Sequence, residues 1–164
     1  MKSLFLVFRT LVYATGFVWL WWWLAMMSRR YDRAIPWRLP AFAPALGIVI
    51  GIAGAILLAL CLGEFVTRGQ GTPAPFDAPR RFVAIGPYRY VRNPMYIGAL
   101  SVLVGFALYL RSPSVLGLVL AAFLAFHAFV LAYEEPALRA KFGAEYEDYC
   151  RRVRRWLPRL PEAS

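Results

Sequence analysis

Two short polar motifs interrupt an otherwise apolar sequence, and their residue types suit a charged ligand. The first is Arg92-Asn93-Pro94-Met95-Tyr96. Asn is a preferred N-cap residue and Pro is favoured at the first helical position, so a helix is predicted to begin after Asn93. The unpaired N–H groups at that helix end, with Arg92 and Arg89 beside them, could bind a carboxylate or a phosphate. A capped helix whose arginines meet lipid headgroups would have the same sequence.

The second motif is Tyr133-Glu134-Glu135-Pro136, at the end of another apolar stretch. Negative charge at a helix C-terminus is unfavourable by a few tenths to about 1 kcal/mol, which suggests that the two carboxylates have a use. His127 lies seven residues before Glu134, hence on the same helix face and about 10 Å deeper. An ionisable residue within a span is a candidate functional residue. A neutral histidine bonded to another helix is the alternative.

The elements that position these motifs follow from the composition. The chain has 164 residues, is 60% hydrophobic and 17% charged, and has a mean hydropathy of +0.53, which together indicate a membrane protein and exclude disorder. Cys61 and Cys150 are too few for a disulfide scaffold, and no metal-binding motif is present. Of the 19 basic residues, 17 are Arg, and they cluster at the ends of apolar segments. A membrane therefore explains the net charge of +10 better than a nucleic acid does.

A helix of about 20 apolar residues crosses a hydrocarbon core of about 30 Å, and four stretches come close to that length. We predict spans at 4–27, 41–63, 94–110 and 114–134. The predicted fold is an all-α integral membrane helical bundle of about four transmembrane helices with a C-terminal amphipathic interfacial helix. Residues 1–80 form an N-terminal transmembrane helix pair and the start of a cytoplasmic loop. Residues 81–164 form the candidate catalytic helix hairpin and the cytoplasmic C-terminal helix.

The distribution of basic residues predicts the orientation. With four crossings, both termini and the 64–93 connection share one side, which carries 14 Arg and Lys residues against five on the other. The side with more basic residues is cytoplasmic, so both termini are predicted there. Glycines and prolines in 64–93 predict an ordered loop without a long regular element. The excess of Arg over Lys suggests a bacterial source, and hence the inner membrane.

Helix lengths place the two motifs side by side. At 1.5 Å per residue, the chain descends roughly 28 Å from Asn93 to Ser112 and climbs roughly 33 Å from Ser112 to Glu134. An antiparallel hairpin therefore brings the start of the third span beside Glu134 and Glu135 near the cytoplasmic surface. Such an arrangement of a positive helix end and two carboxylates can hold a zwitterion.

The tail after Pro136 has apolar residues at intervals of three or four, which predict an interfacial amphipathic helix that Gly143 could break in two. Arginines crowd its end, so anionic lipid headgroups are its predicted partner. The helix could also cover whatever binds at the mouth of the hairpin. The apolar positions are Leu138, Phe142, Tyr146, Tyr149, Val153 and Trp156.

Three segments together resemble the superfamily of isoprenylcysteine carboxyl methyltransferases and phospholipid (phosphatidylethanolamine N-) methyltransferases. They are Gly86 to Gly98, Glu134-Glu135, and Phe142 to Tyr149. Arg92-Asn93-Pro94 stands where the isoprenylcysteine enzymes carry Arg-His-Pro. Any role that the family gives to the histidine of that motif is therefore in question here, because Asn93 can supply only a neutral hydrogen bond.

The resemblance implies S-adenosyl-L-methionine as the cofactor, bound without a Rossmann domain, and a lipophilic substrate that enters from the bilayer. His127 and Glu134 are the candidate catalytic residues, as proton acceptors for an amine substrate. The implied cofactor contacts are Tyr90, Arg92, Asn93, Pro94, Tyr96, Glu134 and Glu135.

Two other functions fit the same residues. A membrane reductase of the sterol type resembles the superfamily in its C-terminal hairpin but uses NADPH, and a non-catalytic membrane scaffold would bind neither cofactor. The sequence leaves open whether the methyl acceptor is a carboxylate or an amine, and it leaves the oligomeric state open.

Overall fold

The computed structural model describes residues 2–64 and 85–158, and within these ranges the fold is helical throughout, without a β-strand. Most of the predicted 64–93 loop lies outside the described residues. The long helices are α1 (Lys2–Ser28), α2 (Ala43–Glu64), α3 (Pro94–Tyr109) and α4 (Pro113–Phe129). The short ones are the 3-10 helices η1 (Arg29–Ala34) and η3 (Gly86–Arg89), the π-helix η4 (Val130–Glu134), α5 (Glu135–Phe142) and α6 (Ala144–Arg152).

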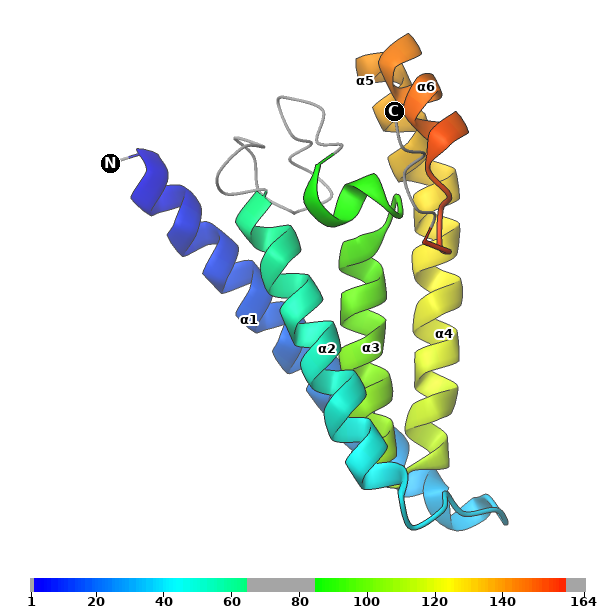
Figure 1. Ribbon diagram of the computed structural model, residues 1–164. Helices are drawn as coiled ribbons and strands as arrows, with labels where there is room; N and C mark the ends of the chain where they lie inside the picture. The colour runs from blue at the N-terminus through cyan, green and yellow to red at the C-terminus, as the bar shows by residue number, and fades with distance from the viewer. Residues whose placement is uncertain (1, 65–84, 159–164) are drawn as a thin grey trace.

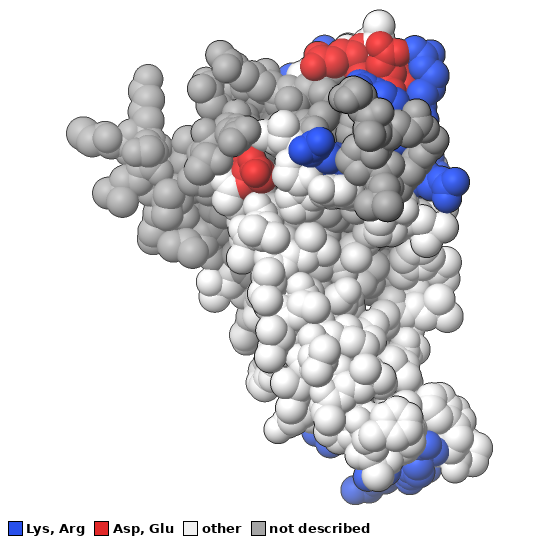
Figure 2. Space-filling view, in the orientation of Figure 1, with Lys and Arg blue, Asp and Glu red and all other residues white. Residues whose placement is uncertain are grey.

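Helices stand at all four predicted positions. Ala43–Glu64 and the continuous run Pro113–Phe142 are long and apolar enough to cross a membrane, and α3 is apolar but shorter. Many large apolar side chains on these helices face outward, as lipid contact requires, among them Val49, Ile52 and Leu120. Figure 2 shows a tall uncharged band between charged residues at its two ends. A membrane protein is supported, whereas the number of crossings stays a prediction.

Glycines allow α2 and α3 to lie in close contact (Figure 1). A Cβ atom on Gly47 would lie 2.5 Å from the carbonyl oxygen of Gly105, and one on Gly54 would lie 2.7 Å from that of Gly98. Only hydrogen fits at these distances, so the two backbones approach as in small-residue packing between membrane helices. The Gly47-x-x-x-Gly51 spacing carries this signal in the sequence, and the sequence analysis missed it.

The turn between α3 and α4 starts α4 at Pro113, one residue before the predicted span at 114–134, with Ser112 as the N-cap. The Ser112 hydroxyl accepts a hydrogen bond from the Val115 amide. It also donates to Asp32 Oδ1, which in addition accepts from the Ser114 amide, both at 2.9 Å. Burial acts to raise the pKa of Asp32, but these hydrogen bonds and the charge of Arg29 outweigh it and hold the pKa below its ordinary value. An η1 carboxylate therefore caps the start of α4.

The tail folds back on the hairpin. Gly143, with φ at +52°, separates α5 from α6, so the predicted tail helix is two short ones. Helix α6 ends at Arg152, so Val153, which is extended, and Trp156, which lies in a bend, do not continue the helix. The Arg92 amide donates to the Arg154 carbonyl at 2.9 Å, next to a single bridge between Val91 and Arg154. The last described residues thus lie against the start of α3.

Candidate functional site

The two polar motifs meet at one end of the hairpin, as the helix lengths predict. Tyr96, in the first turn of α3, donates a hydrogen bond from its hydroxyl to Glu134 Oε2 at 2.8 Å. Glu134 ends the π-helix η4, whose wider turn is a form that often occurs at functional sites. Among the described residues, Tyr96 is the only hydrogen-bond partner of Glu134, so its other oxygen can meet a ligand.

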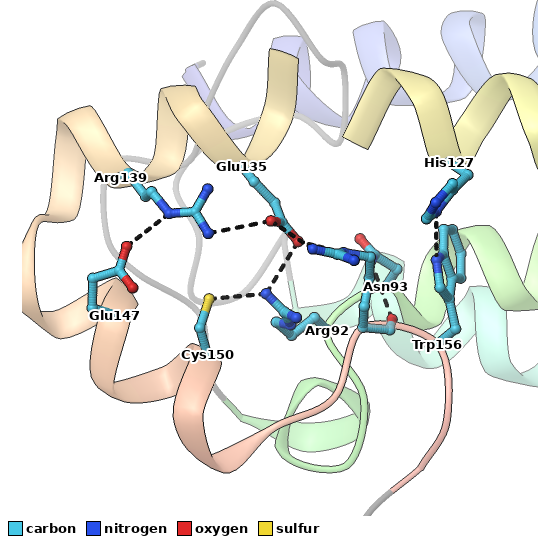
Figure 3. A network of polar contacts seen from close by, with 9 residues as sticks. Arg92, Asn93, His127, Glu135, Arg139, Glu147, Cys150 and Trp156 are labelled. Carbon is cyan, nitrogen blue, oxygen red and sulfur yellow. Dashed lines mark hydrogen bonds and ion pairs between the residues drawn. The ribbon is translucent and has the colours of Figure 1, made fainter. Parts of the chain in front are cut away.

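Glu135 lies at the centre of an ion-pair network (Figure 3). Its side chain is 4% exposed, and its carboxylate meets three arginines. Arg155 binds it through two bonds, Nε to Oε1 at 2.7 Å and Nη2 to Oε2 at 3.0 Å. Arg92 Nη1 reaches Oε1 at 3.1 Å, and Arg139 Nη2 reaches Oε2 at 3.4 Å. A buried carboxylate needs such compensation, so its role here is to hold arginines in place.

Arg92 is the arginine of this network that belongs to the first motif. Its side chain is mostly buried, and Nη1 donates both to Glu135 and to Cys150 Sγ, the latter at 3.0 Å. Its Nε atom is buried and has no hydrogen-bond partner among the described residues. A buried donor without a hydrogen-bond acceptor lowers the stability of the fold. A ligand or a water molecule could supply the acceptor for this N–H group.

Asn93 occupies the N-cap position of α3, but its side chain does not cap the helix. The buried amide instead donates from Nδ2 to the Arg155 carbonyl at 3.1 Å. The predicted capping role of its side chain is therefore wrong. The physical reason is that a buried tail carbonyl needs a donor, and this amide supplies it.

His127 is bonded to the tail. The Trp156 indole donates from Nε1 to His127 Nδ1 at 3.0 Å, and the Phe123 ring stacks on the imidazole. The Trp156 ring also lies edge-on to Tyr96, with centroids 6.4 Å apart. His127 is thus bonded through its side chain, as the alternative predicted, although its partner is the tail and not another helix.

The tail residues Arg155, Trp156 and Cys150 were not predicted as part of the site. The hydrogen bond to Glu135 raises the pKa of Arg155, which keeps this guanidinium charged. In the sequence Arg155 is one of several arginines at the end of the chain, and no local pattern separates it from Arg154. Only the path of the tail identifies it.

Most of the predicted cofactor contacts come together. Pro94 is buried at the first position of α3, beside the residues described above. Tyr90 is 40% exposed, and among the described residues no hydrogen bond or ring contact joins its side chain to the others. The residues brought to this end of the hairpin are Arg92, Asn93, Pro94, Tyr96, Glu134 and Glu135.

Comparison with known proteins finds relatives of this chain. Two relatives, each a "Probable protein-S-isoprenylcysteine O-methyltransferase" from Oryza sativa (subspecies indica and japonica), are 31% identical over 122 residues, 71% of this chain and 62% of theirs. The chain thus spans less than two thirds of their length. An uncharacterized protein of Haemophilus influenzae is 41% identical over 64 residues, 38% of this chain and 100% of its own. No solved structure matches.

The family model described as phospholipid methyltransferase matches residues 42–145, from the start of α2 into α6. This range holds both polar motifs and the whole hairpin. It also covers more than half of the chain. The chain therefore belongs to the phospholipid methyltransferase family.

Proposed function

We propose that the protein is a membrane methyltransferase that moves a methyl group from S-adenosyl-L-methionine to a lipophilic acceptor at the mouth of the α3–α4 hairpin. The observation that carries this proposal is the buried Nε of Arg92 at the meeting point of the two motifs, which has no hydrogen-bond partner among the described residues. Family membership supports the same assignment. By the count of basic residues, this mouth faces the cytoplasm, where the cofactor would be available.

The residues present fit the amino-acid part of the cofactor, which carries a carboxylate and an ammonium group. Arg92 Nε would donate to the carboxylate, in a charge-assisted hydrogen bond. The free oxygen of Glu134 would accept from the ammonium group, while Tyr96 holds the other oxygen. The bound cofactor supplies a methyl group made electrophilic by a positively charged sulfur.

The remaining residues position these groups and exclude water. We assign Glu135 to holding Arg92, because its carboxylate is already neutralised by three arginines. The aromatic rings of Tyr96, Phe123 and Trp156 lie against one another beside the mouth and keep it dry. Methyl transfer is an in-line displacement, which depends mainly on such positioning.

The chemistry of the acceptor decides whether a base is needed. A carboxylate acceptor attacks without losing a proton, whereas an amine acceptor must lose one first. His127 accepts a hydrogen bond at Nδ1, so a neutral ring carries its proton on Nε2 and can take another only by releasing Trp156. Glu134 has no arginine partner among the described residues, so its oxygen that Tyr96 does not hold could either accept from the cofactor's ammonium group or take the proton of an amine. For an amine acceptor we assign it the second role.

Ligand-dependent unfolding tests the cofactor. We expect S-adenosylhomocysteine to raise the unfolding temperature of the detergent-solubilised chain and NADPH to leave it unchanged. The reverse result would support the reductase, and no effect of either would support the scaffold. A radiolabelled methyl-transfer assay on extracted membrane lipids, with the labelled product identified, then names the acceptor.

Glu134→Gln tests the site. We expect the variant to bind S-adenosylhomocysteine at least tenfold more weakly, a loss of about 1.4 kcal/mol, because a neutral amide attracts an ammonium group less than a carboxylate does. Glu147→Gln is the matched control, since Glu147 is exposed and lies away from Tyr96, on α6. Unchanged affinity in folded Glu134→Gln protein would reject this contact.

A further inference from the structure

A second charged feature lies at the opposite end of the bundle from the candidate site. It is a recess of about 500 Å³ lined by Arg29, Arg30, Asp32 and Arg33, all of η1. In Figure 1 the segment between α1 and α2 lies at the opposite end of the bundle from α5 and α6. Helix α3 has 16 residues and so separates the two ends by roughly 24 Å. The recess therefore belongs to the other face of the membrane, and it plays no part in the proposed methyl transfer.

The arginines of this recess lack a free carboxylate partner. Asp32 is the only acidic residue between positions 28 and 42. Its Oδ1 is taken up by the start of α4, where it accepts from the Ser112 hydroxyl and the Ser114 amide. In the part of the chain that the structure describes, none of the three guanidinium groups forms an ion pair. Three positive charges thus face a recess that holds one carboxylate, and one oxygen of that carboxylate is bonded to the start of α4.

Neighbouring arginines on the same segment are used differently. Arg111 donates from Nε and Nη2 to the Leu39 carbonyl, and Arg38 donates from Nη1 to the Asp32 carbonyl. These two side chains tie the 28–42 segment to itself and to the α3–α4 turn. Arg30 Nη2 donates to Met27 Sδ at 3.0 Å, a weak acceptor, in an exposed hydrogen bond. The contrast marks Arg29 and Arg33, and the remaining donors of Arg30, as available to bind something else.

The surroundings of the recess are those of a membrane interface. Large aromatic side chains near it are exposed, on the last turns of α1, on η1 and on the segment that leads into α2; they are Trp22, Trp23, Tyr31, Trp37 and Phe42. Trp and Tyr are enriched at the level of the lipid headgroups, where the phosphates also lie. In Figure 2 blue basic residues lie at this end, directly below the uncharged band.

We propose that this recess binds the phosphate of an anionic phospholipid in the leaflet opposite the candidate site. One guanidinium group can donate two parallel hydrogen bonds to two oxygens of a phosphate, whereas a lysine ammonium group acts as a point charge. Several guanidinium groups around one recess can therefore bind a phosphate from several sides. Three arginines against one carboxylate leave an excess of positive charge, so a lipid with net negative charge is preferred over a zwitterionic one. The interface places such a phosphate at the height of the recess.

Native mass spectrometry of the full chain in neutral detergent tests this proposal, with phosphatidylglycerol and phosphatidylcholine as the probes. We expect phosphatidylglycerol to bind at least fivefold more tightly than phosphatidylcholine. In Arg29→Gln/Arg33→Gln the tightest phosphatidylglycerol site should weaken at least fivefold. Arg151→Gln/Arg152→Gln removes the same charge from the tail and should change that site by less than twofold.

Three results would overturn the proposal. They are unchanged binding in Arg29→Gln/Arg33→Gln, equal affinity for the two lipids, and displacement of the lipid by inorganic phosphate at equal concentration, which would indicate a free-phosphate site. Circular dichroism and lipid-free unfolding check that the variants fold. If the double variant does not fold, Arg33→Gln alone serves, with a loss of at least twofold expected and no loss counting against the site. Methyl-transfer activity is not the readout, so failure here leaves the proposed function standing.

Discussion

Glu135→Gln probes what holds the tail on the hairpin. The substitution keeps the shape of the side chain but removes its charge and replaces one acceptor oxygen with a donor NH₂ group. That group would then face the guanidinium groups of Arg92 and Arg155, which pair with no other carboxylate among the described residues, whereas Arg139 also pairs with Glu147. The tail depends on these contacts, because Arg155 is anchored through two bonds to Glu135.

The size of the effect follows from the exposure of each partner. Removing one member of a buried ion pair costs about 3–5 kcal/mol, because a buried charge is left without compensation. The Arg92 side chain is 13% exposed and that of Arg155 is 28% exposed, so water relieves part of this cost. Arg139 is 44% exposed and contributes at most about 1 kcal/mol. We therefore expect a loss of about 3 kcal/mol.

Hydrogen exchange of the amides in residues 153–157, measured in micelles, reports this loss. A loss of about 3 kcal/mol corresponds to roughly hundredfold faster exchange through tail opening. The matched control is Glu147→Gln, which breaks the exposed pair with Arg139 and should cost about 0.2–1 kcal/mol. If Glu135→Gln is within about 1 kcal/mol of the unmodified protein and its tail exchanges no faster, the network does not hold the tail.

Three other substitutions test the fold around the site. Gly47→Ala should destabilise by about 1–3 kcal/mol in detergent-induced unfolding because its Cβ meets backbone, whereas Gly117→Ala, with open space, should be neutral or stabilising; equal effects would contradict the close α2–α3 contact. Asp32→Asn should lose stability at pH 7, and the difference should shrink as pH falls below about 3.8, since the folded pKa of Asp32 is lowered; a pH-independent difference would contradict this. Trp156→Phe removes the bond to His127 and should speed tail exchange about fivefold, a loss of about 1 kcal/mol; unchanged exchange would show that this bond does not hold the tail.

The helices and the meeting of the two motifs were predictable from the sequence. Apolar runs bounded by Ser112-Pro113 and Asn93-Pro94 mark where helices begin, and the structure starts α4 and α3 at those prolines. The similar lengths of these two antiparallel helices then place Tyr96, at the start of α3, beside Glu134, at the end of the π-helix that follows α4. The close contact of α2 and α3 was also predictable, since the Gly47-x-x-x-Gly51 spacing is visible in the sequence.

The roles of the two adjacent glutamates were decided by the tertiary structure alone. Glu134 and Glu135 have the same chemistry and neighbouring positions, yet one carboxylate keeps a free oxygen while the other is enclosed by three arginines. The difference arises because α6 ends at Arg152 and the chain then turns back onto α3, a path that no local pattern encodes. Residue type and spacing determine which groups can come together. Long-range packing determines which of several identical arginines lies close enough to neutralise the Glu135 carboxylate.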